Sequence, residues 1–354
     1  MDLSFYQNKT VLVTGHTGFK GAWMCQVLKL QGAKVIGYAL EPPTEPSLFY
    51  LAKVSEGMTS IIGDIRSFRH LNETIAVHQP EIVIHMAAQP IVRESYEKPV
   101  YTYDVNIMGT VSLLEAVRQH ACVRSVVNVT TDKVYRNNEW AWGYREDDVL
   151  DGYDPYSNSK SCSELVTNSY RNCFFRQREI AVSTCRAGNV IGGGDFARDR
   201  IIPDCVRAQQ LGEEIIIRNP YSTRPYQHVL EPVCAYLKLA ELQYLDAVRY
   251  EGSYNVGPDD CDCVSTGSLA ELFCQLWGDG ATWRDESEEN APHEAGLLKL
   301  DCSKIKQAMG WKPRWNIQKA VAETVAWSRM YLAGGDYTAE MKKQILRYLK
   351  QEKA

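Results

Sequence analysis

The sequence lacks the features that mark several other classes of protein. It contains no run of lysine and arginine, and its formal net charge is −5, so we do not expect it to bind nucleic acid or an anionic membrane surface. It contains no uninterrupted apolar stretch near the roughly 18 residues of a membrane span. The first residues, Met1 to Phe5, lack the basic start and apolar stretch of a secretion signal. We therefore expect a soluble, cytoplasmic protein.

Paired cysteine motifs are also absent. The 11 cysteines are scattered from Cys25 to Cys302, and none has the CxxC spacing of a zinc ribbon or a redox site. Cys261 and Cys263 form a lone CxC, but no histidine or further cysteine lies near enough in sequence to complete a metal site. We expect buried thiols and no bound metal.

Short β-branched runs alternate with longer helix-like stretches through the first half of the chain. This alternation is typical of βαβ units that pack helices on both faces of a parallel sheet. It predicts an α/β fold with a Rossmann-type doubly wound sheet. The candidate strands are residues 10–13, 34–38, 59–62, 82–85, 123–129 and 181–185, and the first helix is residues 21–30 with Gly32 as its C-terminal cap.

After Arg186 the sequence changes to segments interrupted by glycine and proline. A chain of 354 residues exceeds the size at which one hydrophobic core usually stops growing, about 250 to 300 residues. We therefore expect a cofactor-binding domain over residues 1–186, with a segment near 227–256 returning to it. A smaller mixed α/β substrate-binding domain is expected over 187–226 and 257–354. The charged end, residues 342–354, is predicted to be a solvated helix.

A glycine loop follows the first predicted strand. Gly15, Gly18 and Gly21 lie between this strand and the first helix, where a dinucleotide-binding loop belongs. Glycines allow a tight turn and close backbone approach to a pyrophosphate, and the helix N-terminus attracts the anion. Glu41, about 20 residues further on, would accept hydrogen bonds from the adenosine ribose and repel a 2′-phosphate, which favours NAD over NADP.

The GxxGxxG spacing resembles that of the short-chain dehydrogenases and their extended relatives. The resemblance implies that Asp64 and Ile65 lie at the adenine, and that Ala87, Ala88 and Gln89 lie beside the pyrophosphate and the nicotinamide ribose. The complete set of candidate cofactor-binding residues is Gly15, Thr17, Gly18, Phe19, Lys20, Gly21, Glu41, Asp64, Ile65, Ala87, Ala88, Gln89, Tyr156 and Lys160.

Two motifs carry the candidate chemistry. Tyr156 and Lys160 have helical i, i+4 spacing, so the ammonium can stabilise a phenolate and lower the tyrosine pKa until it accepts a hydroxyl proton. Lys160 could also hold the cofactor ribose. Thr131, Asp132 and Lys133 close a predicted strand at the edge of the sheet where such folds bind ligands. Thr131 would position a sugar hydroxyl, and the two following residues add the acid and base groups of a dehydratase.

Longer stretches are similar to the CDP-glucose branch of the nucleotide-sugar 4,6-dehydratases, and together they span nearly the whole chain. These stretches are residues 15–21, 84–90, 140–146, 154–160, 186–196, 217–220, 224–232, 292–295 and 298–304. The resemblance implies conversion of CDP-glucose to CDP-4-dehydro-6-deoxyglucose and water, with NAD regenerated in each turnover, in deoxysugar synthesis of the O-antigen type. It implies that Asp132 is the acid for the C6 hydroxyl. The related dTDP-glucose dehydratases have a glutamate where this chain has Lys133, which leaves Lys133 as either the C5 base or a stabiliser of the enolate.

The resemblance also assigns residues to the substrate. Asn189 and Arg224 fit the diphosphate, because an amide can donate to one phosphate oxygen and a guanidinium can bind another. Arg93 could reach NAD or the nucleotide sugar, or form a surface salt bridge. The candidate substrate-binding residues are Arg93, Asn189, Asp195, Arg198, Arg224 and His228. Relatives pair through two helices, so we expect a homodimer or homotetramer that uses residues 105–119 and 156–175.

Two other readings remain. A nucleotide-sugar 4-epimerase would use Tyr156, Lys160 and Thr131 but would not need Asp132 and Lys133 for water elimination. A regulator that binds the dinucleotide without catalysis typically loses the YxxxK motif, which this chain keeps.

Overall fold

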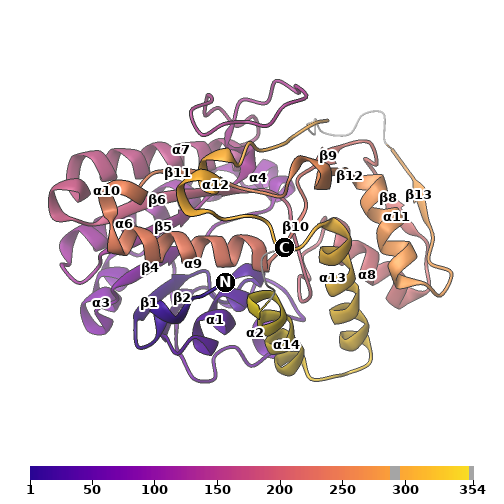
Figure 1. Ribbon diagram of the computed structural model, residues 1–354, viewed down its shortest axis with the longest axis horizontal. Coiled ribbons are helices and arrows are strands. Elements are labelled where there is room, and N and C mark those ends of the chain that lie inside the picture. The colour runs from indigo at the N-terminus through magenta and orange to yellow at the C-terminus, as the bar shows by residue number, and fades with distance from the viewer. Residues whose placement is uncertain (288–295, 351–354) are drawn as a thin grey trace.

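A parallel sheet forms the centre of the molecule (Figure 1). The structure is a computed structural model that describes residues 1–287 and 296–350. Within these residues, seven strands form one sheet in the order β11-β6-β5-β4-β1-β2-β3, and every neighbouring pair is parallel. The strands are β1 Thr10–Thr14, β2 Lys34–Ala39, β3 Thr59–Ile62, β4 Ile82–His85, β5 Ser125–Val129, β6 Ala181–Ala187 and β11 Ser253–Val256.

This order confirms the predicted doubly wound sheet. The chain moves outward from β1 in one direction through β2 and β3 and in the other through β4, β5 and β6, which opens a crevice at the carboxyl ends of β1 and β4. The predicted strands are all present, with ends that differ by at most two residues. Strand β11, Ser253–Val256, was not predicted.

Helices cover both faces of the sheet, as the period of two along a strand requires. On β1, Val11 and Val13 belong to one buried cluster, and Leu12 belongs to the other. The helices around the sheet are α1 Phe19–Leu30, α2 Leu48–Leu51, α3 Phe68–His78, α4 Val92–Glu97, α5 Pro99–Tyr103, α6 Gly109–Gln119, α7 Pro155–Tyr170, α9 Leu230–Leu245, α10 Ala247–Tyr250, α12 Ser303–Met309 and α14 Tyr337–Lys350.

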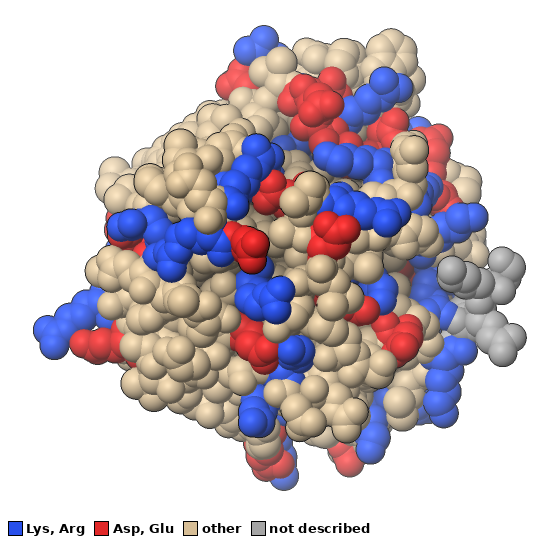
Figure 2. Space-filling model, turned by 60° about the vertical axis from the view of Figure 1, so that its left-hand side comes forward, with Lys and Arg blue, Asp and Glu red and all other residues tan. Residues whose placement is uncertain are grey.

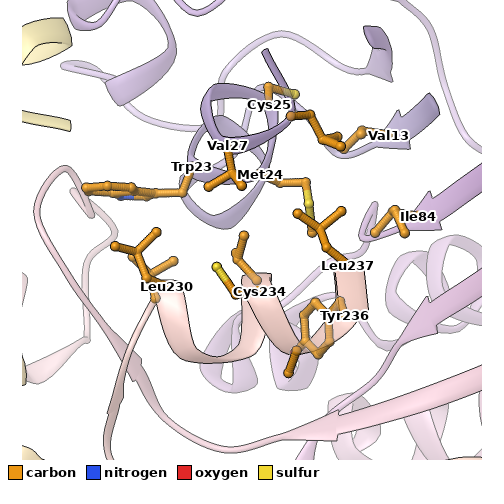
Figure 3. Packing of buried hydrophobic residues seen from close by; sticks show 14 of the residues in the cluster. Val13, Trp23, Met24, Cys25, Val27, Ile84, Leu230, Cys234, Tyr236 and Leu237 are labelled. Carbon is orange, nitrogen blue, oxygen red and sulfur yellow. The ribbon is translucent and has the colours of Figure 1, made fainter. Parts of the chain in front are cut away.

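The first cluster lies between α1 and α9. Figure 3 shows Trp23, Met24 and Val27 of α1 facing Leu230 and Leu237 of α9, and all five side chains are buried. This packing fixes α1, the helix that the glycine loop opens. The expected return of residues 227–256 to the cofactor-binding part remains a proposal, and the position of α9 against α1 and β5 supports it.

A second, smaller group of elements lies at the right of Figure 1. It has its own buried cluster, built from α8, α11, α13 and the pair β8 and β13. Its elements are α8 Ile201–Leu211, α11 Thr266–Trp277, α13 Ile317–Leu332, β7 Val190–Ile191, β8 Ile215–Ile217, β9 Thr223–Arg224, β10 Gln227–His228, β12 Val264–Ser265 and β13 Trp283–Asp285.

Two predictions about the surface were wrong. The C-terminal helix is not solvated on all sides, because Met341, Ile345 and Tyr348 of α14 are buried in the first cluster. Not all thiols are buried either, since Cys173 and Cys261 are exposed. Residues 351–354 of the predicted terminal helix and the stretch 292–295 lie outside the described residues.

The surface carries both signs of charge. Figure 2 shows lysine and arginine interspersed with aspartate and glutamate over the face that it draws. In the two described ranges, no helix is long and apolar enough to span a bilayer.

Candidate active site

The glycine loop is shaped by backbone contacts that exclude side chains at two of its positions. Gly15 has a positive φ of 76°, and a Cβ atom there would lie 2.8 Å from the backbone nitrogen of Ala87. At Gly21 a Cβ atom would lie 2.1 Å from the carbonyl oxygen of Gly15, so this glycine lets α1 pack on the loop. Thr17 donates its hydroxyl to the Leu40 carbonyl at 2.8 Å, which fixes the loop against the end of β2.

Gly18 is different, because no protein atom lies close to the side on which a Cβ atom would stand. A Cβ atom there would meet nothing nearer than the Gly15 carbonyl at 3.5 Å. Gly18 is also the N-cap of α1, and no side chain caps the helix there. An uncapped helix N-terminus beside open space is the arrangement that binds a pyrophosphate, so the loop fits a dinucleotide.

The acidic cofactor candidates lie at the ends of β2 and β3. Glu41 is exposed and accepts a hydrogen bond from the Tyr50 hydroxyl at 2.8 Å. Asp64 binds the Arg66 guanidinium at 2.6 Å, and this hydrogen bond lowers the pKa of its carboxyl. Ile65 points inward, since it is buried in the cluster on the other face of the sheet.

Hydrogen bonds to buried side chains hold the loop after β4 in place. Ala87 donates its N–H to the Thr14 hydroxyl at 3.2 Å, and Ala88 follows it at the edge of the crevice. Gln89 is buried, and its side-chain amide donates to Thr102 at 2.9 Å. Its backbone is also engaged, because its N–H donates to Asn106 Oδ1 at 2.9 Å and its carbonyl accepts from Asn106 Nδ2 at 3.1 Å, so Gln89 shapes the loop from inside the protein.

The candidate acid and base lie together after β5. Thr131 donates its hydroxyl to Asp132 Oδ1 at 3.0 Å, and the Lys133 ammonium lies 3.6 Å from the same oxygen. The Asp132 side chain is only 1% exposed, yet its Oδ2 has no hydrogen-bond partner among the described residues. A buried acceptor without a partner indicates that a ligand completes this site.

Tyr156 and Lys160 lie on α7 beside this cluster, and both are buried. Burial raises the pKa of Tyr156 to about 12, although the Thr131 hydroxyl and the charge of Arg200 act to lower it. Burial also lowers the pKa of Lys160 to about 7, as does the charge of Lys20, and its Nζ donates to the Val129 carbonyl at 3.2 Å. Desolvation thus outweighs the nearby charges at Tyr156, and the lowering of the tyrosine pKa by Lys160 stays a prediction.

Lys20 and Arg200 are two further cations at the site. Lys20 lies two residues after Gly18. Burial lowers the pKa of its ammonium to about 8. The charge of Arg200 lowers this pKa further, whereas the charges of Asp132 and Asp195 raise it. Arg200 pairs with Asp195 at 2.9 Å. Sequence reasoning did not select Arg200, because its pairing with Asp195 depends on the fold of the loop that carries both residues.

Some of the substrate candidates lie near the catalytic cluster, and others lie at the surface. Asn189 accepts from the Lys133 ammonium at 3.3 Å, and Arg224 is 6% exposed and donates to the Thr223 carbonyl. Asp195 also lies near the catalytic cluster, whereas Arg198 is exposed. Arg93 forms a salt bridge with Asp199 at 3.4 Å, which is one of the alternatives expected for it.

His228 is not brought to the site. It is completely buried, with Trp23 on one side at 5.9 Å and Trp315 on the other at 4.8 Å between ring centres. Burial first, and then the charge of Lys319, lower the pKa of His228 to about 3. Its ring is a neutral part of the core, which corrects its assignment to the substrate.

A buried hydrogen-bond chain joins the strand ends to α6 and α7. The Thr14 hydroxyl accepts from two backbone N–H groups, so its own proton goes to His85 Nδ1 at 2.7 Å. His85 Nε2 then donates to Thr110 at 3.3 Å, and Thr110 bonds Ser163 of α7 at 3.0 Å. Asn128 of β5 donates to the same serine at 3.0 Å. We call these five residues the strand-end chain.

A second buried network, missed from the sequence, lies behind Lys160. Glu164 pairs with Arg186 at 2.8 Å, and both side chains are at most 3% exposed. Glu164 also accepts from the Thr184 hydroxyl at 2.7 Å, so α7 is tied to β6. The four-residue spacing from Lys160 to Glu164 was visible in the sequence, but the partner strand was not.

Comparisons with known proteins agree with this geometry. The family model for GDP-mannose 4,6 dehydratase matches residues 12–324. The CDP-glucose 4,6-dehydratase of Salmonella typhimurium is 49% identical over 354 residues, covering 99% of this chain and 98% of the relative. A UDP-glucose 4-epimerase of Mycolicibacterium smegmatis is 28% identical, covering 90% of this chain and 98% of the relative.

A solved structure shows the same fold. The dTDP-glucose 4,6-dehydratase from Bacillus anthracis, in complex with NAD, superposes with a TM-score of 0.75 at 20% identity. The match covers 92% of this chain and 98% of that one.

Proposed function

Because this chain belongs to the GDP-mannose 4,6 dehydratase family, we propose that it is an NAD-dependent enzyme that converts CDP-glucose to CDP-4-dehydro-6-deoxyglucose and water. The observation that carries the proposal is the full-length identity of 49% to the Salmonella enzyme of that activity. The placement of Asp132 and Lys133 beside Tyr156 supports it, because an epimerase needs no such pair.

The open face of Gly18 and the uncapped start of α1 would hold the pyrophosphate of NAD, and the end of β2 with Glu41 would hold the adenosine ribose. NAD held there would supply the hydride acceptor for oxidation at C4 and the hydride source for C6. Tyr156 accepts the proton of the C4 hydroxyl, with Thr131 orienting that hydroxyl.

In this proposal Asp132 and Lys133 handle the protons of the elimination, the one removed from C5 and the one given to the departing C6 hydroxyl. Oxidation at C4 acidifies the C5 proton, and departure of the C6 hydroxyl requires an acid. We propose Asp132 as the acid for the C6 hydroxyl and Lys133 as the base for C5, and their separation of 3.6 Å lets both reach one bound sugar. As an ammonium, Lys133 would instead stabilise the enolate oxygen.

Asn189 and Arg224 are proposed to bind the diphosphate. Both belong to the segment between β6 and α9, and Asn189 contacts Lys133 directly. Arg224 is held within β9, where its paired strand β12 fixes the backbone. The contact between Asn189 and Lys133 supports a diphosphate site near the catalytic cluster, in the smaller domain that we propose for residues 187–226 and 257–354.

We further propose that two copies pair through α6 and α7. Three apolar side chains on and beside these helices are well exposed: Met108 at 51%, Leu165 at 55% and Phe174 at 42%. The expected helices are present, although each includes a π-helical turn, at Asp104–Met108 before α6 and at Arg171–Phe175 after α7. An exposed apolar face of this kind is suited to a second copy of the chain.

The test is turnover of CDP-glucose, UDP-glucose, dTDP-glucose and GDP-mannose with added NAD, followed by the alkali-induced ultraviolet absorbance of 4-keto-6-deoxy sugars. We expect a signal with CDP-glucose. No signal with any substrate, despite NAD binding, would reject dehydration in favour of epimerisation.

The variants D132N and K133M separate the two half-reactions. Each should still oxidise C4, seen as the absorbance of reduced nicotinamide, while product formation falls by at least about 100-fold, the usual contribution of a general acid or base. Equal loss of both half-reactions would show that these residues bind substrate without moving protons.

A further inference from the structure

Arg66 lies shortly after the end of β3 and contacts both oxygens of the Asp64 carboxylate. Its Nε donates to Oδ1 at 3.0 Å and to Oδ2 at 3.1 Å, and its Nη2 donates to Oδ2 at 2.6 Å. The backbone N–H of Arg66 also donates to Asp64 Oδ1, at 2.9 Å. A guanidinium that binds both oxygens of a carboxylate fixes its direction as well as balancing its charge. Arg66 therefore sets the orientation of Asp64.

Arg66 is itself held on the side away from Asp64. Its Nη1 donates to Asp104 Oδ2 at 2.9 Å, and Asp104 begins the π-helical turn before α6. The guanidinium also lies over the ring of Tyr101 of α5, 5.3 Å from the ring centre. Turning the guanidinium away from Asp64 would break both of these contacts. The orientation of Asp64 is thus tied to the elements beside β3.

The Asp64 carboxylate keeps room for one more hydrogen-bond donor. An ionised carboxylate has about four lone-pair sites. Three N–H groups of Arg66 occupy it, namely the backbone N–H, Nε and Nη2, and no other residue in the described ranges donates to this side chain. The Asp64 side chain is 29% exposed, and its contact with Arg66 lowers the pKa of the carboxyl, so it stays ionised and can only accept. One acceptor site is left for a ligand.

The order of the strands relates Asp64 to the proposed cofactor site. Strands β1, β2 and β3 are successive neighbours, and such strands lie about 4.8 Å apart. The glycine loop after β1 would hold the pyrophosphate, and Glu41 after β2 would hold the adenosine ribose. The next part of the cofactor is its base, and the next strand end is that of β3, which Asp64 follows.

We propose that Arg66 is a positioning residue for the cofactor, which fixes Asp64 so that its remaining acceptor site takes a hydrogen bond from the exocyclic amine of adenine. This inference rests on the proposed NAD site at the glycine loop. Adenine carries an N–H donor on C6, whereas hypoxanthine carries a carbonyl oxygen there, which a carboxylate repels. Arg66 therefore contributes to the choice of base through Asp64.

The test is calorimetric titration of NAD and of nicotinamide hypoxanthine dinucleotide into the wild type and R66Q, with R69Q as the control. Arg69 lies three residues further on and forms an exposed pair with Glu73. The wild type should bind NAD about ten- to 100-fold more tightly than the hypoxanthine dinucleotide, as expected for a hydrogen bond to a charged group. R66Q should reduce this preference about two- to ten-fold, because binding must then immobilise the Asp64 side chain. R69Q should keep the wild-type preference.

The variants D64N and D64N/R66Q show whether Arg66 acts through Asp64. Their preferences for adenine should be equal, because loss of Arg66 has no further effect once the carboxylate is gone. Each pair of dinucleotides is titrated into one preparation, so the ratio of the two dissociation constants does not depend on how much of a variant folds.

Two outcomes for R66Q would overturn the proposal. Equal weakening of both dinucleotides would show that Arg66 only holds the loop after β3, and an unchanged preference would show that it has no part in binding the base. If the wild type binds neither dinucleotide, the proposed cofactor site and this inference both fail. Binding of NAD by the wild type without a preference for adenine rejects the inference alone.

Discussion

Two glycines of the same loop should respond in opposite ways to the same substitution. Gly18 and Gly21 are three residues apart, yet a Cβ atom at Gly18 meets nothing nearer than 3.5 Å, whereas one at Gly21 meets a backbone oxygen at 2.1 Å. G18A should therefore fold normally and lose NAD, while G21A should lose stability.

The expected sizes follow from the local geometry. At Gly18, φ is −80° and ψ is 171°, which alanine adopts freely. The reduced entropy of the unfolded chain stabilises the variant by about 0.4–1 kcal/mol. The poorer N-cap destabilises it by about 0.5–1 kcal/mol, so the net change is close to zero. At Gly21, overpacking of up to about 3 kcal/mol exceeds the gain in helix propensity of about 1 kcal/mol, which leaves a loss of about 2 kcal/mol.

Thermal unfolding without NAD measures the stabilities, and calorimetric titration measures NAD binding. In G18A the NAD dissociation constant should rise at least about ten-fold, equivalent to about 1.4 kcal/mol, because the methyl group occupies the space of the pyrophosphate. If G18A binds NAD as tightly as the wild type, the open face of Gly18 is not the cofactor site.

Three further outcomes are expected. E164Q should lower the free energy of unfolding in urea by about 3–5 kcal/mol, because it leaves a buried guanidinium uncompensated. E73Q, at an exposed ion pair, should change it by less than about 1 kcal/mol. Equal effects of the two substitutions would contradict the burial argument. K160M should be more stable than the wild type at pH 6. The pKa of Lys160 is about 7 in the folded protein and ordinarily 10.5. Its burial therefore destabilises the folded state below pH 7 by the full amount and has no such effect above about pH 10.5. The difference should shrink as pH rises through this window, and a constant difference would refute it. L165E should lower the sedimentation coefficient if α7 lies in a dimer interface, while V248E, at a 94% exposed position, should not; a shared response would locate the interface elsewhere.

The sheet was predictable because hydrophobic runs and the glycine loop are local signals. The runs that became β1, β2 and β4 are each bounded by turns, so their ends could be read to within two residues. Strand β11 could not be found in this way. It pairs in parallel with β6, a strand about 70 positions earlier in the sequence, so its partner is not a local signal.

The site was predictable in its motifs and not in its electrostatics. The spacing of Tyr156 and Lys160 identified the pair, but burial of both groups depends on how α7 packs, and burial sets their pKa values. The positions of Arg200 and His228 could not be predicted from the sequence either, because both depend on tertiary packing. Arg200 pairs with Asp195 through the fold of the loop that carries both, and His228 is packed between two tryptophans in the core.

The strand-end chain has a consequence for how this protein can vary. Its members lie on β1, β4, β5, α6 and α7, and each hydroxyl or ring nitrogen has its donor or acceptor role set by its neighbour. Replacing Thr14 alone would therefore leave His85 Nδ1 without its donor and disturb the bond from His85 to Thr110. Substitutions along the chain should be strongly epistatic, with coupling energies of about 0.5–3 kcal/mol. A sequence can leave this arrangement only by changing several residues together, although they are far apart along the chain.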